Sequence, residues 1–123
     1  MNKCHIIGRM TKDPEVRYTQ GGTAVATFTL AVDRRVAKDK PKEADFIPCV
    51  VWGKMADGVV KNYCHKGKQV AVEGRIQVRS YDAKDGTKRY VTEVIVNDLE
   101  LLGKGDGSKQ NNGNYPTDEE IPF

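Results

Sequence analysis

Two parts of this chain alternate between apolar and polar residues with a period of two, and this feature restricts the fold more than any other. In "TAVATFTLAV", residues 23–32, every even-numbered position is apolar, and threonines occupy most positions between them. In "VAVEGRIQVRSY", residues 70–81, the even-numbered side begins apolar, and the odd-numbered side is mostly polar, includes two arginines and ends in an aromatic residue. Such alternation is typical of strands with one buried face. We therefore expect one side of the second stretch to lie in a core, namely Val70, Val72, Gly74, Ile76 and Val78.

Three further segments have strand character. They are residues 3–10, "DFIPCVVW" at 45–52 and "RYVTEVIV" at 89–96. The connection "DAKDGT" contains an Asp-Gly pair, which favours a tight turn, so residues 70–96 are predicted to form a long hairpin. Gln20-Gly21-Gly22 predicts another turn, across which the first strand folds back on the second.

A single short helix is predicted over Lys54–Tyr63. Met55, Val59 and Tyr63 recur every four residues, and Gly67 follows as a stop signal. Gly58 weakens this helix by roughly 1 kcal/mol relative to alanine. The resulting order is three strands, a helix and two strands, which is that of an all-β, five-stranded OB-fold barrel with the helix between strands 3 and 4. A half-open β-sandwich is the alternative.

The composition changes after Leu102. Residues 104–117 are mostly Gly, Asn, Ser and Lys, which predicts a disordered linker after a domain at 1–103. The net charge is +3; residues 104–123 hold two lysines and four acids, so they carry −2 and residues 1–103 carry +5. A basic body indicates a polyanionic partner, and the acidic, hydrophobic "DEEIPF" at 118–123 indicates a separate function.

Neither a secretion signal nor a membrane span is expected, because the apolar run in "MNKCHIIGRM" is short and interrupted. Cys4, Cys49 and Cys64 are an odd number without paired spacing, which favours a reducing compartment and small buried side chains over disulfides or a metal site. We therefore expect a cytoplasmic protein without membrane contact, metal or other cofactor.

Phe46 and Trp52 are the candidate ligand-binding aromatics. They are six residues apart and share a face if their strand is regular. Pro48 cannot donate to a strand ladder, so it belongs at a bulge, which would break that inference, or where its nitrogen faces away from a neighbouring strand. The alternative is that both aromatics face the core, which would turn Ile47, Cys49 and Val51 outward.

Basic residues accompany these aromatics. Arg75 and Arg79 share a strand face with Tyr81, and Lys54 follows Trp52 closely. Exposed rings alternating with cations are typical of surfaces that hold single-stranded nucleic acid without reading its sequence. The loop "DRRVAKDKPKEAD" adds a possible clamp, or a merely solvated run, with Arg34, Arg35, Lys38, Lys40 and Lys42.

The chain resembles the bacterial and phage single-stranded DNA-binding proteins. The resemblance is carried by "IIGRMTKDPEVRYTQGG", "AVATFTLAV", "DFIPCVVWGKMAD", "KGKQVAVEGRIQVRSY", "RYVTEVIV" and the terminal "DEEIPF". It implies an OB-fold, a homotetramer in a bacterial nucleoid or a phage-infected host, base stacking at Phe46, Trp52 and Tyr81, and phosphate contacts at Arg17, Lys54, Lys66 and Arg79. Arg34 and Arg75 are added as phosphate contacts from their positions in the loop and strand above.

Two positions depart from the pattern of that family. Val36 falls where relatives commonly carry a further stacking aromatic, and Pro48 where a basic or polar residue is common. Both departures predict fewer DNA contacts per subunit. For contacts between subunits, the candidates are His5, Ile47, Cys49 and Val51.

The resemblance also implies a function for the tip. Asp118, Glu119, Glu120, Ile121, Pro122 and Phe123 are expected to recruit enzymes of DNA repair, recombination and replication restart. An enzyme is disfavoured, since there is no Gly-rich phosphate loop and no Ser-His-Asp arrangement. A protein-recruiting adaptor and an RNA-binding OB module remain as alternatives.

Overall fold

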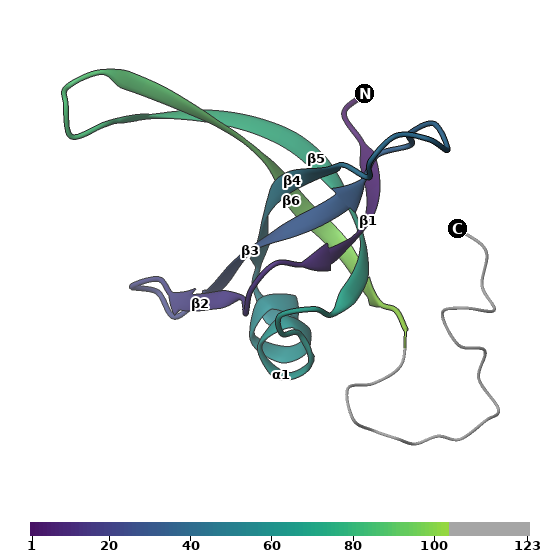
Figure 1. The fold of residues 1–123 in the computed structure, drawn as a ribbon. Helices are drawn as coiled ribbons and strands as arrows, with labels where there is room; N and C mark the ends of the chain where they lie inside the picture. The colour runs from purple at the N-terminus through teal and green to yellow at the C-terminus, as the bar shows by residue number, and fades with distance from the viewer. Residues whose placement is uncertain (104–123) are drawn as a thin grey trace, which may run out of the picture.

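The computed structural model describes residues 1–103, which form a small barrel with a projecting hairpin (Figure 1). Its elements are β1 (Cys4–Met10), β2 (Glu15–Tyr18), β3 (Ala24–Asp33), β4 (Ala44–Trp52), η1 (Ala56–Val60), α1 (Lys61–Tyr63), β5 (Gln69–Asp82) and β6 (Lys88–Leu101). The sheet runs in the order β1-β5-β6-β4-β3-β2, and β1 also pairs with β3. That additional pairing closes five of the strands into a barrel.

Closure combines antiparallel neighbours with one parallel pair, in which Cys49, Val50 and Val51 of β4 lie opposite Val94, Ile95 and Val96 of β6. The helical segment falls between β4 and β5 in the chain. This topology confirms the predicted OB-fold. The prediction did not include β2, a four-residue strand whose register with β3 runs from Glu15↔Thr27 to Tyr18↔Ala24. The Gly22 turn, with φ of 89°, therefore joins β2 to β3 instead of β1 to β3.

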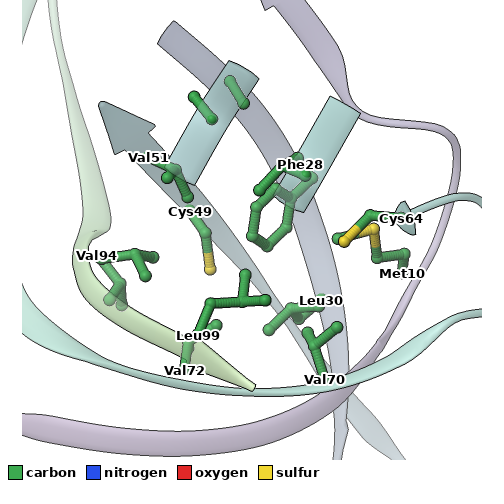
Figure 2. Packing of buried hydrophobic residues seen from close by; sticks show 14 of the residues in the cluster. Met10, Phe28, Leu30, Cys49, Val51, Cys64, Val70, Val72, Val94 and Leu99 are labelled. Carbon is green, nitrogen blue, oxygen red and sulfur yellow. The ribbon is translucent and has the colours of Figure 1, made fainter. Parts of the chain in front are cut away.

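The core lies inside the barrel (Figure 2). The even-numbered residues of β3 from Ala24 to Leu30 are buried, as the alternation predicted. Cys49 and Val51 face them from β4, and Ile47 packs against the same cluster. The outward placement considered for these three residues, and their use as contacts between subunits, is therefore wrong. Cys64 is also buried, as expected for a small apolar residue.

The helical segment closes one end of the barrel (Figure 1). Residues 54–63 are helical throughout, which confirms the predicted range, although η1 is a π-helix. Ala56 and Val60 are the residues fully buried against the core, whereas Met55 and Val59 are only partly buried. Tyr63 is exposed, so the buried face is centred one residue beyond the predicted one.

The hairpin of β5 and β6 extends beyond the barrel as a two-stranded arm (Figure 1). Strand β1 accompanies β5 only as far as Gly74, and β4 accompanies β6 only between Val94 and Val96. Ile76 lies opposite Val94, the last residue of the arm that β4 reaches, and Val78 lies beyond it with no third strand alongside. Their side chains are 47% and 59% exposed. Their predicted burial is therefore wrong, although the hairpin itself is confirmed.

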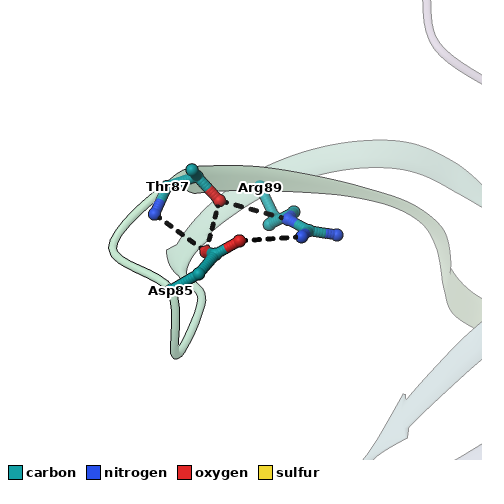
Figure 3. A network of polar contacts seen from close by, with 3 residues as sticks. All are labelled: Asp85, Thr87 and Arg89. Carbon is teal, nitrogen blue, oxygen red and sulfur yellow. Dashed lines mark hydrogen bonds and ion pairs between the residues drawn. The ribbon is translucent and has the colours of Figure 1, made fainter.

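A polar network holds the turn at the end of the arm (Figure 3). The Asp85 carboxylate accepts hydrogen bonds from the backbone N–H and the hydroxyl of Thr87, at 3.0 and 2.7 Å. Arg89 pairs with the same carboxylate at 3.4 Å. These bonds fix an Asx-type turn, and the left-handed Gly86, with φ of 87°, completes it.

Candidate nucleic-acid interface

The outer face of β4 carries two exposed rings. Phe46 is 65% exposed and Trp52 is 50% exposed. The register with β3 is continuous from Val25↔Trp52 to Ala31↔Phe46, so the strand contains no bulge between the two rings. This geometry confirms that the aromatics share one face and point away from the core.

Pro48 fits this strand because it occupies a position that needs no donor toward β3. It lies opposite Thr29, and the Thr29 carbonyl accepts a hydrogen bond from the Thr11 N–H at 3.0 Å, on the side of β1. The N–H and C=O of one strand residue point the same way, so Thr29 and Pro48 form a non-hydrogen-bonded pair. On the other side of β4, the register with β6 begins at Cys49. The missing N–H therefore costs no bond to β3, as one of the two predicted placements requires.

Between the rows of the two rings lies an open groove of about 670 Å³. Its floor is formed by outward residues of β3 and β4, which are Val25, Thr27, Thr29, Pro48 and Val50. Lys12, Arg17 and Arg79 contribute cations to its walls, and Asp13, Glu15 and Glu93 contribute carboxylates. An extended chain with flat apolar groups and anionic links matches such a surface in shape and chemistry.

Arg17 extends the row of Trp52. It lies opposite Val25 in the β2–β3 register, and Val25 lies opposite Trp52 in the β3–β4 register. The Arg17 guanidinium contacts Glu15 at 3.1 Å, and both side chains are largely exposed. A pair this exposed contributes at most about 1 kcal/mol, so a phosphate can compete for the arginine.

The arm contributes its odd-numbered face. The register of β5 with β6 is regular from Gly74 to Asp82, so Arg75, Arg79 and Tyr81 lie on the same face, as predicted. Of these three, only Arg79 lines the groove, where it pairs with Glu93 at 3.0 Å. Arg75 donates to Gln77 at 3.2 Å, and Tyr81 is exposed farther along the arm.

Arg34 is held by acids of its own loop. Its guanidinium contacts Glu43 at 2.9 Å and Asp45 at 2.8 Å, and the backbone N–H of Arg34 donates to the backbone carbonyl of Glu43. The hydrogen bond to Asp45 raises the pKa of Arg34, and the same bond lowers the pKa of Asp45. In the unbound protein Arg34 therefore ties the two ends of the β3–β4 loop together, and it can reach a phosphate only by exchanging these partners.

Lys54 and Lys66 are exposed, and within residues 1–103 their ammonium groups form no ion pair. The backbone N–H of Lys66 donates to Asp13, which lines the groove. His5 lies on the outer face of β1, 3.9 Å from Glu73. The six residues of the predicted tip lie outside the described part of the chain.

Of the charged residues that line the groove, Arg17 and Arg79 were proposed from the sequence, whereas Lys12, Asp13, Glu15 and Glu93 were not. Lys12 belongs to the quoted "MTKDPEVRY" stretch, and its position directly after β1 is the signal that points to it. Glu93 carries no such signal, because an acid in a predicted strand indicates a solvated face. Neither residue could be assigned to the groove without the β3–β4–β6 arrangement.

The closed barrel and its outward aromatic and cationic face define an OB-fold of the kind that carries oligonucleotides or oligosaccharides on its strands. Residues 1–102 match the model of the Single-strand binding protein family, so the chain belongs to this family.

The names of similar proteins agree with this family. The chain is 54% identical to "Single-stranded DNA-binding protein 3" of Clostridium acetobutylicum, with 99% of this chain and 90% of that protein covered. It is 58% identical to the "Single-stranded DNA-binding protein" of Clostridium tetani, with 92% of this chain and 77% of that protein covered. Within residues 1–103, no helix combines the length and apolar composition that crossing a bilayer requires.

Proposed function

We propose that this protein binds single-stranded DNA without sequence preference and coats it during replication, recombination and repair. The observation that carries the proposal is the placement of Phe46 and Trp52 as exposed rings on one continuous strand face. Between their rows lies a groove whose walls present Lys12, Arg17 and Arg79 beside three carboxylates. The family match and the names of the relatives support the same ligand class. The proposed activity requires no cofactor and no catalytic group.

In the proposed complex, bases stack on Phe46, Trp52 and Tyr81, each contact contributing about 1–3 kcal/mol. Phosphates pass the cations Arg17, Lys54, Lys66, Arg75 and Arg79, and Arg34 joins them after leaving Glu43 and Asp45. Val36 is exposed at the position of the missing aromatic, so the β3–β4 loop contributes charge but no stacking ring.

We also propose assembly into a homotetramer. Ile76, Val78 and Tyr90 are exposed on the arm of a single copy, and exposed apolar clusters favour association. The outer face of β1, with His5, is a second candidate contact between subunits. The mass of the protein in solution, with and without oligo(dT), measures assembly and stoichiometry together.

The acidic tip at 118–123 is proposed to recruit DNA-processing enzymes. An aromatic ring near several carboxylates suits a hydrophobic pocket rimmed by Arg or Lys. The preceding segment 104–117 serves as the linker in this proposal. Removal of residues 118–123 should leave DNA affinity equal or slightly higher and should abolish binding to such enzymes; a clear loss of DNA affinity contradicts this separation.

Competition binding tests the main proposal. A labelled oligo(dT) should be displaced by other single strands of equal length but poorly by duplex DNA, and its affinity should fall steeply with salt. Equal affinity for structured RNA favours the RNA-binding alternative. Absence of DNA binding together with capture of enzymes by the tip favours the adaptor alternative.

A further inference from the structure

Glu93 is the only buried acidic side chain among residues 1–103, and it lies in the groove proposed to hold a polyanion. Burying a carboxylate is unfavourable unless it is paired, and a negative charge at this point also repels phosphates. A carboxylate so placed needs a function that outweighs both effects.

The partner of Glu93 is Arg79, on the neighbouring strand. Its Nε–H donates to Glu93 Oε2 at 3.0 Å. The Glu93 side chain is only 6% exposed, whereas that of Arg79 is 54% exposed. The carboxylate is therefore fixed within the structure, and the guanidinium is held against it from the open side of the groove.

The single bond to Nε determines what Arg79 can still offer. A guanidinium has five N–H donors, of which one is on Nε and four are on the two Nη atoms. Because the bond to Glu93 is made by Nε, the Nη edge can make bidentate contact with a phosphate. Arg79 stands on the two-stranded arm, where the side chain would otherwise sample many rotamers.

We propose that Glu93 is a positioning residue, which holds Arg79 by Nε so that both Nη groups face a phosphate in the groove. This inference rests on the proposed DNA-binding function. Holding the arginine before binding reduces the ordering cost that each phosphate contact otherwise carries. The gain in orientation outweighs the repulsion between Glu93 and the phosphate.

If Glu93 affected DNA binding only through its negative charge, removing that charge would raise the affinity for DNA, which is the opposite of what positioning predicts. If the carboxylate only repels DNA, then both Glu93→Leu, which removes charge and acceptor at similar volume, and Glu93→Gln, which keeps an acceptor oxygen, should bind more tightly. Positioning instead predicts that Glu93→Leu binds oligo(dT) about tenfold more weakly, with a salt slope shallower by about 0.7, as for one lost phosphate contact. Glu93→Gln should fall between Glu93→Leu and the unchanged protein.

The test uses the full chain and titrates oligo(dT) at several salt concentrations. Each Glu93 variant is compared in two backgrounds, one with Arg79 unchanged and one carrying Arg79→Ala. The inference is supported if Glu93→Leu weakens binding beside Arg79 and has no further effect in the Arg79→Ala background. It is overturned by equal or tighter binding of Glu93→Leu, or by equal weakening in both backgrounds. Thermal melting reports folding, and if Glu93→Leu melts, the same comparison with Glu93→Gln decides.

The proposed function is judged separately, from the unchanged protein. If that protein fails to bind oligo(dT), the DNA-binding proposal itself is wrong. If it binds and the Glu93 variants bind equally or more tightly, only the positioning inference is wrong.

Discussion

A β-carbon at Gly74 would clash with the backbone carbonyl oxygen of Ile95. The two strands approach this closely beside a register shift, where Glu73 pairs with Asp98 but Gly74 pairs with Val96. The pairing of β5 with β1 ends at the same place, because Cys4 at the start of β1 is paired with Gly74. Any side chain at this position must push the two backbones apart.

Gly74→Ala is therefore expected to destabilise the domain by about 1–3 kcal/mol or more, the usual range for overpacking. Gly58→Ala is the matched control, since a β-carbon there meets nothing within 4 Å and its helical position favours alanine. Urea denaturation should show a lower midpoint for Gly74→Ala and an equal or higher one for Gly58→Ala. Equal midpoints for the two variants would contradict the close approach.

Removing either exposed ring should weaken DNA binding without unfolding the protein. Phe46→Ala and Trp52→Ala should each lose about 1–3 kcal/mol of binding free energy, more than Tyr81→Ala, and should keep the melting temperature. Phe28→Ala is the contrasting variant, because this buried ring should cost about 3–5 kcal/mol of folding stability. Trp52 is the only tryptophan, so stacking should quench its fluorescence on addition of oligo(dT). Unchanged fluorescence at saturation rules out the proposed stacking face.

Cys49 should make the fold sensitive to alkaline pH. Burial raises the pKa of its thiol from the ordinary 9.0 to about 12, with a smaller contribution from Cys4. Between these values the unfolded chain has lost the proton and the folded chain keeps it, so unfolding free energy falls as pH rises, by up to about 1.4 kcal/mol per unit. Cys49→Ala should show a shallower decline in urea denaturation between pH 9 and 11. Parallel profiles for the two proteins would show that the thiol does not carry this dependence.

Asp85 should make the tip of the arm sensitive to acid. The hydrogen bond from the Thr87 hydroxyl is the main cause that lowers the pKa of Asp85. Because the pKa is lowered, the stability that the ionised Asp85 carboxylate contributes is complete above the ordinary value of 3.8. This stability is lost as the pH falls through the pKa of the folded state. The Thr87 amide resonance should therefore shift in acid, and Asp85→Asn should lack that shift. A shift of the same midpoint in Asp85→Asn would assign the transition to another group.

Much of the barrel is predictable from local patterns. The alternation in β3 and the Asp-Gly turn of the hairpin reflect period-two burial and turn chemistry, both of which are readable from neighbouring residues. The shared face of Phe46 and Trp52 followed from the same period. It depended on Pro48 causing no bulge, which only the register with β3 decides.

The errors arise where burial depends on distant strands. Ile76 and Val78 continue the apolar side of β5, yet β1 stops at Gly74 and β4 stops at Val94, opposite Ile76. Strand β2 has four residues, too few to show a hydrophobic alternation. It forms a strand because its backbone pairs with Ala24–Thr27 of β3. The position of Glu93 in the groove was not predicted for the same reason, since its place beside Arg79 depends on pairing between the two strands of the hairpin.

The first strand also determines when the barrel can be completed during synthesis on the ribosome. Residues Cys4–Arg9 of β1 pair with Gln69–Gly74 of β5, and only Arg9 and Met10 pair with β3. Strand β1 therefore stays largely without its pairing partner until more than half of the domain has been synthesised and has left the ribosome. Folding is consequently a late, nearly all-or-none event for a nascent chain, and a truncated product that ends before β5 leaves an open sheet edge available for aggregation.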